Sequence, residues 1–452
     1  MKIIIFGCGK IGTTLISSLS DEGHDIIAID SDPKVIEEVT NIYDVIGLCG
    51  NGIDCDTMNE AGITDTELFI AVTGSDELNM LGCFMARKMG AKHTVARIRN
   101  PEYNDENLSF MKHQLNISVT LNPDLSVAHE IFNLLHFPSA TKIETFSERK
   151  LEIVDFHLKE DSAFVGQSLM ELRKKIDAKF LICDVVRNDE VFIPDGNFIL
   201  KEGDTVGLTA SHEEIKKLFK ILGMTQKHIK SVMILGASRI SYYLAKKLLA
   251  DGITVKIIDK DPERCSEVAN KLKNAIMILG DGMDQEVLLE EGLNSIDAFV
   301  ALTGNDEQNI LSSFFAINQK VPTVITKVNR PELATTAENL GLDRIVSPKS
   351  TVSNVVSRYA RALENSMGSN VETLYKLIDG KAEVLEFNVF DDFKFVDIPL
   401  KNMKLKKNVL IAGIIRRRKP IIPSGLDVIM SGDKVIVVTA GRQLNNLSDI
   451  ME

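Results

Sequence analysis

The sequence predicts an α/β protein in which two doubly wound parallel sheets are each followed by a small α+β domain, as a tandem duplication. Two observations predict this class. Several short motifs recur in the same order at an offset of 229 or 230 within the 452-residue chain. In the first part of each half, short apolar runs alternate with helical patterns, which is typical of a parallel sheet covered by helices.

Four pairs of segments carry the duplication. One short match would mean little, but four in order at a nearly constant offset indicate that one half copies the other. The longest pair has six of nine residues identical. The pairs are Asp30–Pro33 with Asp259–Pro262, Gly50–Gly52 with Gly280–Gly282, Ala71–Asn79 with Ala301–Asn309, and Val95–Pro101 with Ile325–Pro331.

The first part of the first half reads as six strands alternating with helices. Helices are predicted to start near Ile11, Pro33, Asp54, Asp76 and Pro101, and a last one runs from Pro123 to Leu135. Asp32 before Pro33 is a good N-cap followed by proline at the first helical position. The predicted strands are Lys2–Phe6, Ile26–Ile29, Val45–Cys49, Leu68–Val72, Thr94–Ile98 and Ile117–Thr120.

A different pattern follows, with strands crowded together and a tight turn at Asn188-Asp189, and it predicts a small α+β domain. Helices are predicted at Ser168–Lys175 and His212–Leu222. Strands are predicted at Leu151–Leu158, Phe180–Arg187, Val191–Pro194 and Thr205–Thr209. With its repeat in the second half, this gives four domains: 1–138, 139–225, 229–364 and 365–452.

A glycine-rich loop after the first strand predicts a dinucleotide site. The run Gly7-Cys8-Gly9-Lys10-Ile11-Gly12 follows a strand and opens a helix, and Asp30 ends the next strand. This is the context of the Rossmann fingerprint, in which the pyrophosphate lies at the helix N-terminus and the acid binds ribose hydroxyls. Because Asp30 would repel a 2′-phosphate, NAD is favoured over NADP. The alternative is a glycine turn without a ligand.

The second copy of this loop keeps only its first glycine. It reads Gly236-Ala-Ser238-Arg239-Ile240-Ser241, and Ser238 adds a side chain where the backbone should meet phosphate. Asp259 remains, so a ribose contact is still possible. The sequence leaves two alternatives open, a nucleotide site with altered preference or a vestigial site kept for packing.

Further candidate ligand contacts lie at the carboxyl ends of the predicted strands, which face one crevice in a doubly wound sheet. Lys10 and Arg239 in the loops, with Arg97 and Lys327 at the ends of the fifth strands, could meet a terminal phosphate, which favours ATP or ADP as a competing or second-site ligand. Ordinary surface cations are the alternative. The polar candidates are Asn51, Thr73 and Gly74 in the first half and Asp281, Thr303 and Gly304 in the second.

Composition and missing motifs exclude several function classes. The net charge of −12 argues against a nucleic-acid partner. No apolar run is long enough to span a bilayer, and the six cysteines have no zinc-site spacing.

No catalytic motif accompanies the nucleotide site, so a sensor is favoured over the alternative, an NAD-dependent oxidoreductase. The basic run Arg416–Lys419 aligns with a hairpin turn, where a solvated turn or an anionic partner would explain it.

Over essentially its whole length, the chain resembles the TrkA family, the cytosolic regulatory subunits of bacterial and archaeal Trk potassium uptake systems. The tandem duplication, Gly7–Gly12, Asp30, Ala71–Asn79 with its copy, and Arg97 carry the resemblance. It implies that the two larger domains are N-terminal and the two smaller ones C-terminal RCK (KTN) domains. The degraded Gly236–Ser241 loop departs from the intact fingerprint expected in this family.

The resemblance also implies a function without catalysis or metal. Such proteins bind NAD, NADH, ATP or ADP in the N-terminal RCK domains and lie in the cytoplasm, peripherally at the inner face of the cell membrane. They assemble, typically as homotetramers, into a ring of eight RCK units that gates a TrkH-like membrane potassium channel or transporter subunit. A regulator of a different cation channel or of an efflux system is the alternative within this reading.

Overall fold

The described chain folds into two compact units, each assembled from both halves of the sequence. Unit 1 comprises residues 1–132 and 230–357, and unit 2 comprises residues 133–229 and 358–452. The computed structural model describes residues 1–103, 105–137, 140–146, 151–160, 162–188, 190–222, 229–366, 371–377, 381–390, 393–441, 444 and 446–452.

Unit 1 contains two six-stranded parallel sheets with the same topology, β3-β2-β1-β4-β5-β6 and β14-β13-β12-β15-β16-β17. This is the doubly wound order, so the predicted fold class is confirmed. The first sheet comprises β1 (Lys2–Phe6), β2 (Asp25–Asp30), β3 (Ile46–Cys49), β4 (Leu68–Ala71), β5 (His93–Arg97) and β6 (Val119–Leu121). The second comprises β12 (Ser231–Leu235), β13 (Thr254–Asp259), β14 (Ile276–Leu279), β15 (Ala298–Ala301), β16 (Thr323–Lys327) and β17 (Ile345–Val346).

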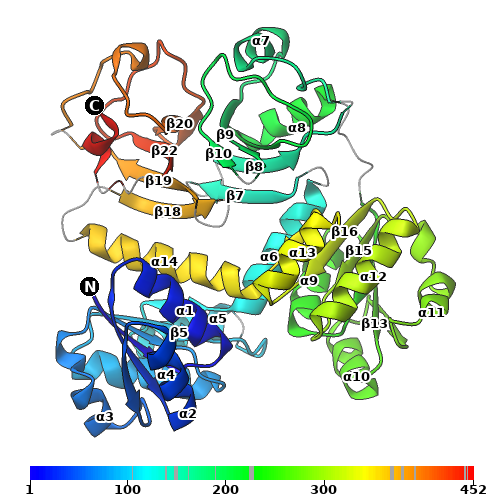
Figure 1. The fold of residues 1–452 in the computed structure, drawn as a ribbon. Coiled ribbons are helices and arrows are strands. Elements are labelled where there is room, and N and C mark those ends of the chain that lie inside the picture. Colours follow the sequence, from blue (N-terminus) through cyan, green and yellow to red (C-terminus); the bar gives the residue numbers. More distant parts are fainter. Residues whose placement is uncertain are drawn as a thin grey trace. The chain divides into compact units, whose positions relative to one another are not determined.

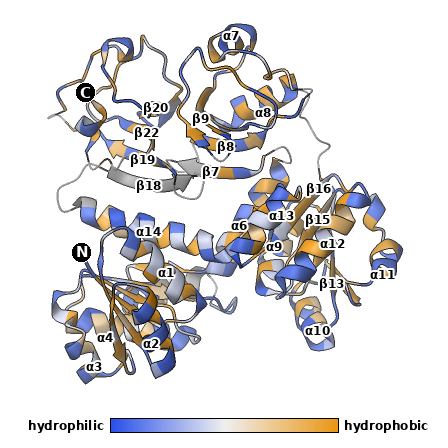
Figure 2. Ribbon diagram, in the orientation of Figure 1, coloured by the Kyte–Doolittle hydropathy of each residue, from blue (hydrophilic) through white to orange (hydrophobic). Residues whose placement is uncertain are grey.

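Helices surround both sheets, and the central strands are almost uniformly apolar (Figures 1 and 2). The helices of the first half are α1 (Lys10–Asp21), α2 (Pro33–Ile42), α3 (Cys55–Glu60), α4 (Asp76–Met89), α5 (Asp105–Gln114) and α6 (Pro123–His136), with a 3₁₀ turn at Ile63–Asp65. Those of the second half are α9 (Arg239–Ala250), α10 (Pro262–Lys271), α11 (Gln285–Glu290), α12 (Asp306–Asn318), α13 (Pro331–Asn339) and α14 (Pro348–Ser366), with a 3₁₀ turn at Leu293–Ser295.

Most predicted elements of the first sheet are confirmed, and Asp32 caps α2 by accepting the N–H of Lys34. The helix predicted near Pro101 is wrong in its start, because α5 begins at Asp105. Asn100 causes the difference: its side chain accepts the N–H of Glu102 and its carbonyl accepts that of Tyr103, so a turn precedes the helix.

Unit 2 contains two five-stranded antiparallel sheets, ordered β10-β9-β11-β8-β7 and β18-β19-β22-β20-β21. The first comprises β7 (Lys142–Phe146), β8 (Leu151–His157), β9 (Leu181–Arg187), β10 (Glu190–Phe192) and β11 (Thr205–Ala210), with helices α7 (Leu169–Lys175) and α8 (His212–Ile221). The second comprises β18 (Val371–Leu377), β19 (Ala382–Asn388), β20 (Val409–Arg416), β21 (Lys419–Ile421) and β22 (Lys434–Ala440), with 3₁₀ turns at Leu400–Asn402 and Leu447–Ile450.

The small α+β domains were predicted with four strands, and β7 is a fifth that the prediction missed. The two sheets of unit 2 share one core, in which Leu151 and Ile153 pack with Ile436 and Val438.

Asn188 has the left-handed φ expected of its hairpin turn, while Asp189 lies outside the described residues. The run Arg416–Lys419 lies on the predicted hairpin turn of the second sheet.

The four domain boundaries stay a prediction. In the part of the chain that the structure describes, no helix is long and apolar enough to cross a membrane.

Candidate nucleotide site

The first glycine loop has the backbone that its sequence predicts. Gly7 has φ +97°, and a Cβ there would lie 2.8 Å from the backbone nitrogen of Thr73. A Cβ at Gly12 would clash with the carbonyl oxygen of Gly7, so this position needs glycine where α1 meets the sheet. Gly9 is the N-cap of α1 and supplies no capping side chain, which leaves the helix N-terminus open to an anion.

Asp30 ties this loop to the sheet. Its Oδ2 accepts the N–H of Cys8 at 2.7 Å, and its Oδ1 accepts the N–H of Asp32 at 3.0 Å. Each carboxylate oxygen keeps a second lone pair for a ribose hydroxyl. The Cys8 side chain is buried under the loop, where burial and the charge of Asp30 raise the pKa of its thiol to about 12. The Cys8 thiol therefore takes no direct part in the site, and the Cys8 backbone N–H serves to hold Asp30.

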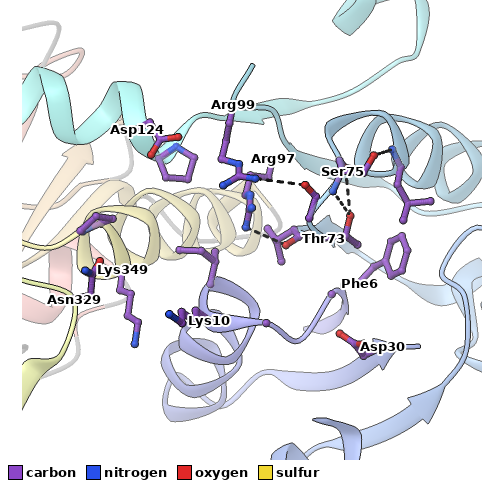
Figure 3. A pocket seen from close by; sticks show the side chains of 18 of the residues that line it. Phe6, Lys10, Asp30, Thr73, Ser75, Arg97, Arg99, Asp124, Asn329 and Lys349 are labelled. Atoms are coloured by element: carbon purple, nitrogen blue, oxygen red, sulfur yellow. Dashed lines mark hydrogen bonds between the residues drawn. The ribbon is translucent and has the colours of Figure 1, made fainter. Parts of the chain in front are cut away.

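A cavity of about 750 Å³ opens at the carboxyl ends of the first sheet (Figure 3). Asp30 lies at one end and Asn329 and Lys349 lie at the other, with Lys10 between them. Both halves of the chain contribute to its walls. The lining residues from the first half include Gly7, Gly9, Lys10, Ile11, Asp30, Ser31, Asn51, Thr73, Gly74, Arg97, Arg99, Pro123 and Asp124; those from the second are Ile240, Lys327, Asn329, Pro348 and Lys349.

The end of the cavity remote from Asp30 is electropositive. Arg97 is 8% exposed and donates one bond, to the carbonyl of Val72 at 3.3 Å, while its Nε has no partner among the described residues. Burial, with the charge of Arg99 beside it, lowers the pKa of Arg97 to about 10, so it remains charged at neutral pH. Lys327 is equally buried, and burial lowers its pKa as well.

Asp76 lies near Arg97 and Asp306 lies near Lys327, and a third carboxylate, Asp124, lies near both cations. Burial raises its pKa, and the charges of Arg99, Arg239, Arg97 and Lys327 oppose that shift. Buried cations are normally paired, and neither Arg97 nor Lys327 has a carboxylate at salt-bridge distance among the described residues, so both can bind an anion in the cavity. The arrangement can hold a phosphate group some distance from the ribose that Asp30 would bind.

The repeated motif Ala71–Asn79 has a structural role that the sequence reading missed. The Oδ1 of Asn79 accepts the backbone N–H and the hydroxyl of Thr73 at 2.8 and 2.7 Å, and its Nδ2 donates to the carbonyl of Arg97 at 2.9 Å. Asn309 makes the same three bonds, to Thr303 and to the carbonyl of Lys327. The motif therefore fixes the backbone that carries Arg97 in one half and Lys327 in the other.

The second glycine loop borders a smaller cavity of about 250 Å³. Asp259 holds this loop as Asp30 holds the first, accepting the N–H of Ala237 at 2.6 Å. The helix N-terminus differs, because the Ser238 hydroxyl accepts the N–H of Ser241 at 3.2 Å and thereby caps α9. Of the predicted second-site residues, Gly236, Ser238, Asp259, Asp281, Thr303 and Gly304 line this cavity.

The structure thus distributes the predicted residues between the two cavities differently from the sequence repeat. Ile240 and Lys327 line the first cavity, although they belong to the second half. Cys8, Gly12 and Arg239 line neither cavity. Sequence reading missed Arg99, Asp124, Asn329 and Lys349. The repeat held a partial signal, since Arg99 and Asn329 follow Arg97 and Lys327 at the same spacing.

Two Rossmann-like sheets in tandem, with an intact glycine loop, an acid and a cation-lined cavity, define a nucleotide-binding protein of the RCK type. The TrkA-N domain family matches residues 3–116 and 232–348, and the TrkA-C domain family matches residues 153–223 and 384–452. The chain therefore belongs to the TrkA family. Because proteins of this family are regulatory subunits, the expectation that the chain is not an enzyme is confirmed.

Individual relatives support this membership. A Trk system potassium uptake protein TrkA homolog of Archaeoglobus fulgidus is 33% identical over 451 residues and covers 100% of both chains. The Haemophilus influenzae TrkA is 28% identical and covers 98% of this chain and 96% of its own. The crystal structure of the GsuK RCK domain shares the fold, with a TM-score of 0.63 at 16% identity over 97% of this chain and 92% of that one.

Proposed function

We propose that the chain is the nucleotide-sensing regulatory subunit of a Trk-type potassium uptake system. It binds NAD(H), or ATP or ADP in competition, in the first cavity and couples that binding to potassium flux through a TrkH-like membrane subunit. The family membership supports the potassium system. The observation that carries the nucleotide is the first cavity, with a ribose-binding carboxylate at one end and buried unpaired cations at the other.

Both ligand types suit the cavity. A dinucleotide would place its adenosine ribose on Asp30 and its pyrophosphate at the open N-terminus of α1, next to Lys10. A nucleoside triphosphate would extend its terminal phosphates toward Arg97 and Lys327. GsuK, which shares the RCK fold, has been solved bound to NAD and, separately, bound to ADP.

Coupling to flux follows from the composition of the cavity walls. Because Lys327, Asn329 and Lys349 come from the second half, a ligand that reaches them bridges both halves of unit 1. A ligand shifts a conformational equilibrium only by its difference in affinity for the two states. NADH and ATP, which differ at the phosphate end, would therefore favour different conformations of a homotetrameric ring of eight RCK units lying peripherally at the inner face of the membrane.

Titration of the purified chain with NADH, followed by its fluorescence, tests the proposal. The chain has no tryptophan, so the optical background is low. We expect saturable binding that ATP, ADP and NAD displace, without NADH oxidation. Absence of binding would refute the nucleotide sensor, and sustained NADH consumption would favour an oxidoreductase.

A second experiment tests the partner. Purification of the tagged chain should recover a potassium-transporting membrane subunit, and recovery of an efflux protein would contradict the proposed partner.

Stoichiometry gives a separate prediction for the second site. Because Ser238 caps α9 with its own hydroxyl, the pyrophosphate position is occupied and we expect one NADH per chain. Ser238→Gly should uncap the helix and raise the binding stoichiometry toward two, measured by calorimetry. Gly9→Ser is the matched change in the first loop and should weaken binding there. Two NADH sites in the unaltered chain would contradict this reading of Ser238.

A further inference from the structure

A hairpin of unit 2 presents a dense group of cations to solvent. β20 and β21 pair antiparallel, with Arg416 opposite Lys419, and the turn between them carries Arg417 and Arg418. Arg417, Arg418 and Lys419 are exposed, and none of them has a carboxylate at salt-bridge distance among the described residues. Arg416 differs from these three, because its guanidinium binds both carboxylate oxygens of Asp433. Three cations of this hairpin are therefore open to a partner.

The backbone of the turn is one that arginine rarely adopts. Arg417 and Arg418 have φ +49° and +66°, in the left-handed region that asparagine and glycine favour in two-residue hairpin turns. Other residues adopt this region only at a cost in free energy. Asn188 has φ +50° at the corresponding position of the first half and is one of the favoured residues. Turn formation therefore does not explain two adjacent arginines.

The first half shows that the fold does not require these cations. Each half keeps the arginine that begins the hairpin, Arg187 or Arg416, and each of these binds an aspartate and a backbone carbonyl in the same way. The next three residues are Asn-Asp-Glu in the first half and Arg-Arg-Lys in the second. Because the strands pair in the same register with either set, the charge of the second hairpin is free to serve another purpose.

Exposed apolar side chains lie beside this hairpin. The Nη2 of Arg416 donates to the carbonyl of Val428 at 2.7 Å, which places the segment 426–430 next to the base of the turn. In this segment Leu426 is 73% exposed and Met430 is 39% exposed. The corresponding positions of the first half carry an asparagine and a lysine, so the second half has apolar side chains where the first has polar ones.

The acids near Arg416 leave these cations unneutralised. The bond to Asp433 raises the pKa of Arg416, and the charges of Asp427 and Asp397 add to this shift. Asp427 is itself bonded, since it accepts the N–H and the hydroxyl of Ser424 at 2.7 and 2.6 Å. The hairpin surface, which we define as Arg417, Arg418, Lys419, Leu426 and Met430, thus combines unpaired cations with exposed apolar side chains.

We propose that the hairpin surface of unit 2 binds the headgroups of anionic lipids at a membrane surface. Arginine and lysine bind lipid phosphates, while a protruding leucine enters the boundary between the headgroups and the acyl chains. A bilayer thus satisfies both kinds of side chain, whereas an acidic protein segment would satisfy the cations alone. A nucleic acid fits less well, because a chain with a net charge of −12 would repel it.

The proposal rests on the proposed function only for the location of the chain at a membrane, and it does not involve the nucleotide. Each cation near an anionic bilayer strengthens binding by about fivefold, so the three together contribute roughly a hundredfold, and salt screens this attraction. We expect the full-length chain to sediment with vesicles of phosphatidylglycerol and phosphatidylcholine. Binding to vesicles of phosphatidylcholine alone should be much weaker, and salt should release the chain from the anionic vesicles.

A triple variant that copies the first half tests the cations. Arg417→Asn with Arg418→Asp and Lys419→Glu gives the turn the residues that the first half has there, so the hairpin should form. Its affinity for the anionic vesicles should fall by roughly a hundredfold or more. The control is Lys216→Glu with Lys220→Glu, which removes a similar amount of positive charge from exposed positions on α8. This control should bind the vesicles like the unaltered chain.

A single variant tests the apolar part of the surface. Leu426→Asn copies Asn197 of the first half and removes the side chain that would enter the bilayer. Its affinity for the anionic vesicles should fall by about tenfold, and this loss should persist at a salt concentration that weakens the contribution of the cations.

NADH titration of the same variants separates this proposal from the nucleotide site. The triple variant should bind NADH like the unaltered chain, so failure of the nucleotide sensor and failure of lipid binding give different results. The lipid proposal would be overturned if the unaltered chain did not bind the anionic vesicles, or if the triple variant bound them equally well. A triple variant that kept its vesicle affinity but no longer recovered the membrane subunit would show that the surface binds an acidic protein segment instead.

Discussion

Asp30→Ala is expected to lower the affinity for NADH by well over tenfold. Loss of two charge-assisted hydrogen bonds to the ribose, at about 1.5–3 kcal/mol each, predicts this magnitude, since ~1.4 kcal/mol corresponds to tenfold in affinity. A second effect adds to it, because the Asp30 carboxylate also accepts the N–H groups of Cys8 and Asp32 and so holds the glycine loop in place. Fluorescence titration with NADH measures the loss.

The second half offers a matched control for this experiment. Asp259 holds the second glycine loop through Ala237 and Asp261, at 2.6 and 2.9 Å, in the same geometry as Asp30. Asp259→Ala should therefore disturb its own loop to a similar degree but leave NADH binding in the first cavity nearly unchanged. If both variants lost affinity equally, the effect would be one of folding. If Asp30→Ala bound NADH normally, the ribose would lie elsewhere.

The first glycine loop was predictable because its requirements are local. Gly7 needs a positive φ and Gly12 must approach the Gly7 carbonyl, and both constraints appear directly in the residue type. The strands of the parallel sheets were predictable for a similar reason, since burial on both faces makes them continuous apolar runs. Strand β7 (Lys142–Phe146) was missed because it is short and carries the charged residues Lys142 and Glu144, so it lacks the continuous apolar run of the other strands.

The other end of the cavity was not predictable from either half alone. Arg99, Asp124, Asn329 and Lys349 lie in the same cavity because the strand ends of the two halves face each other, and this arrangement depends on packing. Printed contacts hold the halves together at this point: the Tyr243 hydroxyl donates to the carbonyl of Arg99 and accepts from the side chain of Asn122, both at 3.1 Å. No residue type or spacing encodes such a contact.

Charge at this end of the cavity should separate ATP from NADH. Arg97 and Lys327 are buried cations without a carboxylate at salt-bridge distance among the described residues, so a terminal phosphate would gain charge-assisted bonds there that a dinucleotide need not make. We expect Arg97→Ala to lower ATP affinity by roughly tenfold to a hundredfold, at about 1.5–3 kcal/mol for the lost bond, and to change NADH affinity much less. Competition against bound NADH measures both.

A second substitution shows whether both halves bind the same phosphate. Lys327→Ala should weaken ATP binding in the same direction, and the double variant should lose less than the sum of the single losses if the two cations share one phosphate group. Arg97→Lys is the control, because it keeps the positive charge. It shows how much of the change comes from loss of the structural hydrogen bond between Arg97 and the Val72 carbonyl. If Arg97→Ala lowered the affinities for ATP and NADH equally, Arg97 would support the end of its strand and would not bind the terminal phosphate. In that case discrimination between the two nucleotides would have to arise at other groups of the cavity, such as Lys10 and the N-terminus of α1.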